Sequence, residues 1–466
     1  MAVQAHAPEH PTAQVSRGVL APLALAQFIC SFAGSNMNVM INDMSADLHT
    51  TVQGIQISIT AFLLVMAAFM IPGGKLTDRY GRKRCFLAGL TVYGVGAILS
   101  AAAPGLGLLI VGNSVLEGVG TALLIPPVYI LTTLYFTDQT ARARAFGVVM
   151  AMGGLGAAAG PLIGGLITSA ISWRAAFGFQ TLVIVAIILL SLRITDPLPA
   201  DPKRSFDGWG AVLSAVGLLL VVLGIVAASS NLWLTLGLML GGALVLLWFM
   251  LWVRAQERTG REPLISSSIF RVHASNLGLV TQNLQWLILM GSSFTVAAYL
   301  QVVRHYDAVQ TGVIFTAATI GVLAASLRSE PLSRRFAQRT LIMTGFIVTA
   351  AGIGVLIGMV KGFPGPWAFA PGLLLIGIGV GLGLTPSVNL VQSAFPEERQ
   401  GEISGVSRSI SNLGSSFGTA IAGTILVANL SRSAYGVAMV VLAVIGLGGL
   451  VVGARLPREA HRHDAV

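Results

Sequence analysis

Glu117 and Arg408 are the ionisable residues that lie deepest within the long apolar runs of this 466-residue chain. A carboxylate in such surroundings is costly unless it is protonated, paired or facing water, so Glu117 is a candidate proton carrier. The alternative for Glu117 is a protonated structural acid that bonds to a neighbouring helix. For Arg408 the alternative is a side chain that reaches outward to the membrane surface. Asp43, which we expect near the outer end of the first apolar run, is a second candidate proton carrier.

Amide and aromatic side chains are interspersed among the same apolar runs. Each one alone is more often an interhelical hydrogen bond than a ligand contact. Together they predict an apolar cavity with a few hydrogen-bonding groups, suited to small amphipathic molecules and poorly suited to sugars or phosphates. These candidate cavity residues are Asn36, Asn38, Asn113, Tyr129, Gln282, Asn283, Gln285, Trp286 and Asn389.

A dense basic segment, residues 73–84, joins the second and third apolar runs. Its five cations and single carboxylate are not tolerated in hydrocarbon and are favoured on the cytoplasmic side of a membrane. We expect a cytoplasmic loop that latches one conformation through Gly73, Asp78, Arg79 and Arg82. The alternative is an ordinary loop whose charge only sets orientation, but such a loop needs neither the glycines nor the aspartate.

Small residues recur between positions 153 and 165, around a single proline. They allow two helix backbones to approach closely, and the proline removes a backbone donor and bends its helix. The pattern predicts a tight, kinked helix contact that could rock, and its alternative is plain small-residue packing. The residues concerned are Gly156, Gly160, Pro161, Gly164 and Gly165.

The elements that carry these residues must be membrane-spanning helices. The chain is 55% hydrophobic and only 10% charged, with a mean hydropathy of +0.81. A spanning helix needs about 20 mostly apolar residues, and fourteen such runs can be drawn. They lie near 18–42, 54–72, 85–104, 106–134, 145–168, 174–193, 208–228, 231–253, 277–303, 311–327, 340–360, 367–391, 404–428 and 434–454.

Charge placement supports an even number of spans with both ends in the cytoplasm. Under that topology 23 of the 28 lysines and arginines fall in cytoplasmic segments and only four in outer loops. This asymmetry follows the positive-inside rule. The formal net charge of +10 then reflects orientation and contact with anionic lipid, so we expect no nucleic-acid partner.

The basic segment resembles the loop between helices 2 and 3 of the major facilitator superfamily. Gly160-Pro161 and Gly164-Gly165 are similar to the antiporter motif of its drug:proton antiporter branch, and fourteen spans resemble the larger subgroup of that branch. The resemblance implies an all-α polytopic membrane protein of two six-helix bundles with two extra central helices. The implied parts are a disordered cytoplasmic tail at 1–17, bundles at 18–193 and 276–454, a linker with the extra helices at 194–275, and a cytoplasmic tail at 455–466.

Three departures from the subgroup's pattern affect the expected proton path. Ala33 stands where the subgroup usually has an acid, and Glu117 stands where it usually has an amide. Arg408 lies three residues before Ser411, which aligns with a position that is commonly arginine, and a shift of three keeps nearly the same helix face. The family's proton mechanism therefore cannot be carried over unchanged.

The sequence predicts a transporter and not an enzyme. No GxxxxGK[ST] loop is present, and no soluble segment is long enough for a nucleotide domain, so ATP-driven transport is rejected and no cofactor is expected. Cys30 and Cys85 have no disulfide or metal spacing. We expect a monomeric secondary efflux transporter of the bacterial plasma membrane that exchanges protons for small amphipathic substrates by alternating access. The alternatives are an exporter of a dedicated metabolite or lipid with atypical or no proton coupling, and a non-transporting membrane sensor or scaffold.

Overall fold

The computed structural model describes residues 13–136, 139–196, 206–227, 231–333, 335–362, 365–395, 400–428 and 432–457. Helices joined by short turns make up nearly all of these ranges. The first half contains α1 (Ala13–Asn36), η1 (Met37–Val39), α2 (Ile41–Asp47), α3 (Val52–Tyr80), α4 (Arg82–Ala101), α5 (Leu106–Leu109), η2 (Ile110–Glu117), α6 (Gly118–Tyr135), α7 (Gln139–Ala170) and α8 (Trp173–Ser191).

The remaining helices are two central ones and a second set. The central pair is α9 (Gly208–Ala227) and α10 (Leu232–Arg258). The second set contains η3 (Ser267–Arg271), α11 (His273–Ala298), η4 (Tyr299–Val303), α12 (Ala308–Ser333), α13 (Gln338–Gly362), η5 (Pro366–Phe369), α14 (Ala370–Gln392), α15 (Gln400–Ala428) and α16 (Arg432–Ala454).

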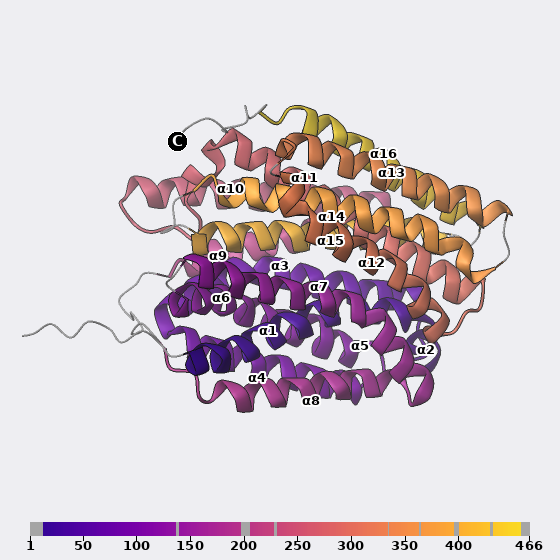
Figure 1. Ribbon diagram of the computed structural model, residues 1–466, viewed down its shortest axis with the longest axis horizontal. Helices are drawn as coiled ribbons and strands as arrows, with labels where there is room; N and C mark the ends of the chain where they lie inside the picture. The colour runs from indigo at the N-terminus through magenta and orange to yellow at the C-terminus, as the bar shows by residue number, and fades with distance from the viewer. Residues whose placement is uncertain are drawn as a thin grey trace, which may run out of the picture.

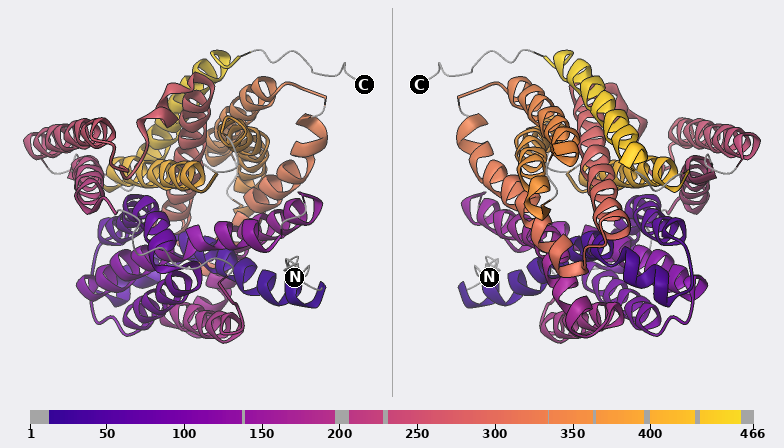
Figure 2. Two further views of the ribbon diagram at one scale, coloured as in Figure 1. Left: turned by 90° about the vertical axis from the view of Figure 1, so that its left-hand side faces the viewer. Right: turned by 90° about the vertical axis from the view of Figure 1, so that its right-hand side faces the viewer.

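The two sets of helices form two bundles that lie one above the other in Figure 1. We call α1–α8 the N-terminal bundle and α11–α16 the C-terminal bundle. They meet along two seams, where α3 packs against α15 and α7 packs against α12. Helices α9 and α10 lie to one side of both bundles (Figure 2), and α9 contacts α3 and α15 at the first seam.

Thirteen helices of the described part of the chain are long and apolar enough to cross a membrane. The fourteenth predicted run, residues 404–428, lies in α15, which is a helix of 29 residues. Serine side chains lower the hydropathy of α15, and the contacts below show that some of them face the other bundle and some face α11. Length and periodicity therefore identify this helix, although its hydropathy is lower.

The basic segment is not a loop, which corrects the prediction for residues 73–84. Helix α3 continues through Tyr80 and α4 begins at Arg82, so Gly81 alone separates them. Its φ of 96° is a conformation that side-chain-bearing residues rarely adopt, and this explains the glycine. A group of cations cannot enter hydrocarbon and so predicts a loop, but the end of one long helix and the start of the next also project into water.

The predicted run at 106–134 is one continuous helix that contains a π-helical segment. Helix α5, the π-helix η2 and α6 follow one another without a break, and Glu117 is the last residue of η2. A second π-helix, η4, ends α11. Segments of this kind are uncommon and are frequent at functional sites.

Candidate functional site

Glu117 is fully buried inside the N-terminal bundle. Its Oε1 accepts a hydrogen bond of 3.4 Å from Ser100 Oγ on α4, and the hydroxyl of Tyr93 lies close to the same carboxyl group. Tyr93 itself donates to Gln180 on α8. Within the described part of the chain, Glu117 Oε2 is buried without a hydrogen-bond partner. An unpaired carboxylate is costly in these surroundings, so the arrangement fits a carboxyl group that can hold a proton.

The contact between α4 and η2 leaves no open space beside Glu117. A Cβ atom added to Gly96 would lie 2.9 Å from Glu117 Cγ and 2.6 Å from the carbonyl oxygen of Gly112. One added to Gly112 would lie 2.6 Å from Ser100 Oγ. Glycine at both positions is therefore required for the close approach that buries the acid.

Arg408 joins the two bundles and does not pair with Glu117. Its Nη2 donates a hydrogen bond of 2.7 Å to the Tyr129 hydroxyl on α6, and its guanidinium lies 5.8 Å from the centre of that ring. Tyr129 in turn donates to Gln27 Oε1 on α1 at 3.2 Å. The predicted cation and one predicted cavity residue thus form one polar bridge across the seam. Cys30 on α1 lies within electrostatic range of both Arg408 and Glu117.

Three polar side chains fasten α3 to α15, and none was predicted from the sequence. Gln56, which is buried, donates to the carbonyl oxygens of Thr419 and Ala420 at 3.5 and 3.4 Å. Ser416 Oγ donates to the Thr60 carbonyl at 3.2 Å. Ser409 Oγ donates to the Ala67 carbonyl at 2.6 Å. A glutamine on an apolar helix and a run of serines on another were signals that could have indicated this seam.

The small residues of α7 face two different helices. Cβ atoms at Gly156 and Gly160 would overlap the Phe28 carbonyl and the Ser35 hydroxyl on α1, and one at Gly164 would lie 3.0 Å from Asn36 Cβ. These three glycines are spaced four residues apart and share one face.

The other face of α7 meets the C-terminal bundle. A Cβ atom at Gly165 would overlap the carbonyl oxygen of Ala308 on α12. In the reverse direction, a Cβ atom at Gly312 would overlap the carbonyl oxygen of Pro161. The small residues of α7 therefore make two tight contacts, one with α1 inside the N-terminal bundle and one with α12 between the bundles, near the C-terminal end of α7.

Two further features join or flank the bundles at the same end. Gln301 in η4 donates to the Asn38 carbonyl at 2.6 Å and accepts from the Asn42 amide at 3.1 Å. Asp43 in α2 has an exposed side chain, yet partial burial of its carboxyl group and the nearby Asp307 charge raise its pKa. Asp43 therefore lies beside the contact between the bundles, within electrostatic range of Asp307.

Asp47 is held on the outer surface of the N-terminal bundle. It pairs with Arg174, and Trp173 Nε1 donates to its Oδ2 at 2.9 Å. Hydrogen bonds from Arg174 and Trp173 lower the pKa of Asp47. Arg174 Nη2 also donates to the Ala103 carbonyl at 2.8 Å, so one arginine ties α2 and the turn after α4 to α8.

The predicted latch residues lie at the opposite end of α3. A Cβ atom at Gly73 would overlap the Ala122 carbonyl oxygen, so this glycine sets the approach of α3 to α6. The guanidinium of Arg79 lies 5.6 Å from the centre of the Tyr80 ring. The side chain of Asp78 lies outside the described part of the structure.

Asp196, which was not predicted as a site residue, caps the start of α4. Its Oδ2 accepts from the backbone amides of Arg82 and Lys83 at 2.6 and 3.3 Å. A carboxylate at a helix N-terminus satisfies amides that have no partner within the helix and interacts favourably with its dipole. Lys83 Nζ also donates to the Leu192 carbonyl at 2.8 Å. The linker after α8 is thus fixed to the basic segment.

The candidate cavity residues divide into three groups. Gln282 and Asn283 bond to α15, through Ser407, Ser411 and the Ile410 carbonyl, and Asn113 bonds to Ser58 at 3.5 Å. Asn36, Asn38 and Gln285 are buried, and within the described chain each keeps a side-chain atom without a hydrogen-bond partner. Trp286 is half-buried and Asn389 is exposed. The first group serves helix packing, and the second retains unused hydrogen-bonding capacity.

This architecture can be compared with known proteins. A sequence profile of the Major Facilitator Superfamily matches residues 23–282 and 279–465, nearly the whole chain. The chain belongs to the major facilitator superfamily. The puromycin resistance protein pur8 of Streptomyces alboniger is 29% identical over 416 residues, with 87% of this chain and 81% of pur8 covered. The multidrug resistance protein Stp of Mycobacterium tuberculosis is 27% identical, with 85% of this chain and 73% of Stp covered.

A solved structure of the peptide transporter POT with sulfate has the same fold. Its TM-score is 0.68 at 18% identity, and the match covers 94% of both chains. The predicted fold class and the multi-pass plasma membrane location of this superfamily member are confirmed. The names of the relatives support the predicted class of secondary active efflux transporter.

Proposed function

We propose that this superfamily member exports small amphipathic compounds in exchange for protons, as a monomer, by alternating access between its two bundles. The observation that carries the proposal is the polar bridge from Arg408 through Tyr129 to Gln27, which links α15 of one bundle to α6 and α1 of the other. A bridge of a few hydrogen bonds can break and re-form as the bundles rock. Similarity to proteins named for puromycin and multidrug resistance supports drug-like substrates.

The outer ends of the bundles are the contacts that must separate for release to the outside. The Gln301 hydrogen bonds and the glycine contact of α7 with α12 hold these ends together. Contacts made by backbone and small residues slide at low cost because no long side chain must be rearranged. We assign α7 and α12 as the moving contact at this end.

Proton coupling is assigned to Glu117, with Asp43 as the second site. Glu117 is enclosed between α4 and η2, so a proton reaching it must pass through the N-terminal bundle, where Tyr93 and Ser100 are its nearest polar neighbours. Substrate would sense its protonation indirectly, through the packing of α4 against η2 and α6. Asn36, Asn38 and Gln285, with unused hydrogen-bonding atoms, are the preferred substrate contacts of the predicted cavity.

Transport by the purified protein in liposomes tests this proposal. An imposed pH gradient should drive uphill movement of lipophilic cations or neutral drugs from a panel that also contains lipids. Transport of panel compounds that is indifferent to the gradient would contradict proton coupling. Movement of lipids alone would favour the second candidate, a dedicated exporter, which Ala33 in place of the subgroup's usual acid favours.

A further inference from the structure

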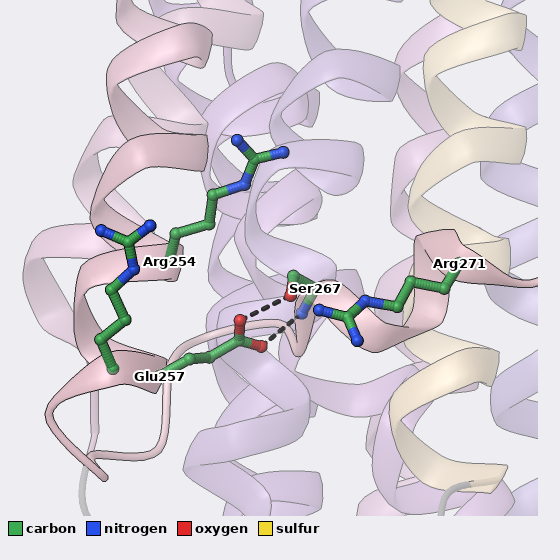
Figure 3. Close-up of a pocket in the computed structure, with 5 residues that line it drawn as sticks. Arg254, Glu257, Ser267 and Arg271 are labelled. Carbon is green, nitrogen blue, oxygen red and sulfur yellow. Dashed lines mark hydrogen bonds between the residues drawn. The ribbon is translucent and has the colours of Figure 1, made fainter.

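Three arginines converge on a pocket at the end of α10, away from the transport seams. The pocket has a volume of about 450 Å³ and is lined by Arg254, Glu257, Arg258, Ser267 and Arg271. Figure 3 shows Arg271 reaching towards Ser267 from η3 and Arg254 projecting from α10 on the other side. All three arginine side chains are exposed.

The single carboxylate of the pocket does not neutralise these arginines. Glu257 accepts from the Ser267 amide at 2.6 Å, from the Ser267 hydroxyl at 2.5 Å and from the Ser266 hydroxyl at 3.3 Å. Arg271 lies within electrostatic range of the Glu257 carboxylate. In the part of the chain that the structure describes, however, none of the three guanidinium groups forms an ion pair or a hydrogen bond. The pocket therefore has an excess of positive charge and unused donors.

The wall that carries Arg271 is fixed in place. Ile269 of η3 is fully buried and packs in a cluster with Val253 of α10 and Ile403 of α15. The amide of Ser266 donates to Glu402 Oε1 on α15 at 2.7 Å. Arg271 is thus presented to α10 by an anchored segment, so the spacing of the three cations is set by the fold.

Exposed tryptophans mark the depth of the pocket in the membrane. Trp209 and Trp248 are 47% and 51% exposed, and their rings meet edge to face at 5.9 Å. Tryptophan side chains are enriched at the level of lipid headgroups. Arg254 follows Trp248 by six residues, a rise of roughly 9 Å along a helix, so it extends from the tryptophan layer towards water. The end of α10 that carries the pocket lies on the side of the molecule where α1 begins and α16 ends (Figure 1), and the charge distribution assigns this side to the cytoplasm.

We propose that this pocket binds the phosphate headgroup of an anionic lipid of the cytoplasmic leaflet. Guanidinium groups match phosphate oxygens with paired, charge-assisted hydrogen bonds, and basic pockets at this depth attract anionic lipids. A free phosphate would use the same donors. The tryptophan pair favours the lipid, because its acyl chains would lie along the exposed apolar face of α10.

Native mass spectrometry of the full-length protein with phosphatidylglycerol or phosphatidylcholine tests the assignment. Wild type should bind phosphatidylglycerol in preference to phosphatidylcholine, and the triple variant Arg254→Gln, Arg258→Gln, Arg271→Gln should lose about tenfold in phosphatidylglycerol affinity. The control Arg328→Gln, Arg335→Gln, Arg455→Gln removes the same charge from exposed arginines elsewhere on the same face and should change it less than twofold. Replacing the three pocket arginines by lysine should weaken binding by an intermediate factor, since charge remains without the paired donors.

Three outcomes would overturn the proposal. Equal losses in the pocket and control variants would indicate diffuse attraction to the whole basic face. Unchanged phosphatidylglycerol binding in the glutamine variant, with loss of inorganic phosphate binding, would assign the pocket to a free anion. Failure of wild type to prefer phosphatidylglycerol would exclude a headgroup site. Matching thermal unfolding midpoints of all variants without added lipid would exclude misfolding as the cause.

Discussion

At the scale of single residues, Glu117 and Arg408 belong to separate networks. The carboxyl group of Glu117 lies with Ser100 and Tyr93 inside the N-terminal bundle, whereas Arg408 reaches from α15 to Tyr129 across the seam. The Glu117 network is suited to hold a proton. The Arg408 network depends on the relative position of the bundles, because its hydrogen bond joins them. Coupling would then operate through the helices between them, and these include α6, which carries Tyr129.

Glu117→Gln should separate transport from its driving force. Glutamine is close in size and neutral, so the packing of Gly96 against residue 117 should persist. We expect substrate binding to remain and transport driven by a pH gradient in liposomes to fall at least tenfold, with exchange in the absence of a gradient retained. Wild-type rates under the gradient would show that the proton is carried elsewhere.

Tyr129→Phe should weaken the bridge between the bundles and keep the ring beside Arg408. The change removes the hydroxyl that accepts from Arg408 and donates to Gln27. A hydrogen bond to a charged group contributes about 1.5–3 kcal/mol, so the midpoint of thermal unfolding should fall and transport should drop severalfold. Tyr306→Phe, a half-buried tyrosine outside this bridge, is the matched control. Equal behaviour of the two variants would argue against a role for the bridge.

The depth of both ionisable residues could be predicted from the sequence, but their partners could not. Hydropathy places Glu117 near the middle of its run and Arg408 inside its run, because a long apolar run must cross the membrane. Which neighbour each side chain meets depends on the rotation of its helix and on which helices are adjacent, and no local pattern records either. The same holds for Gln56, whose acceptors lie more than 360 positions along the chain.

At the scale of elements, α7 is built to contact two helices at once. Gly156, Gly160 and Gly164 form the face towards α1, and Gly165 with Pro161 forms the face towards α12. The small-residue spacing predicted a tight contact, and the structure divides it between one contact within a bundle and one between bundles. For the basic segment, the position between two helices is predicted correctly, but the loop conformation is wrong. Its charges and glycines favour a loop, whereas α3 stays helical through Tyr80.

Gly165→Val should block the outer contact of α7 with α12. Its side chain would overlap the Ala308 carbonyl, and overpacking of this kind costs about 1–3 kcal/mol. We expect transport to fall at least tenfold at matched membrane expression. Gly154→Val lies on the same helix at a position where an added Cβ meets nothing within 4 Å, and should transport normally. Similar loss in both variants would point to a general intolerance of valine in α7.

At the scale of the whole molecule, the bundles are joined at their outer ends, and α9 lies along the first seam. Thr424 Oγ1 of α15 donates to the Ile225 carbonyl of α9 at 3.1 Å, and α9 also contacts α3. The extra helices therefore touch both bundles at one seam and leave the second, between α7 and α12, as the freer one. Opening at the outer end should be governed by the second seam and by the charges beside it.

External pH should bias this outer opening through Asp43. Its pKa is raised by partial burial and by the nearby Asp307 charge, so the joined arrangement favours the neutral acid. The stabilisation is present at pH values below the ordinary aspartate range and is lost as the pH rises through the raised pKa.

Spin labels on cysteines at Ile171 and Trp367, two exposed outer positions on different bundles, should report shorter distances at acidic external pH. Cys30 and Cys85 are buried and should not interfere. Asp43→Asn should hold the short distance across the pH range. Asp47→Asn should leave the pH response intact, because hydrogen bonds from Arg174 and Trp173 lower the pKa of Asp47 instead of raising it. A pH response that survives in Asp43→Asn would assign the sensor to another group.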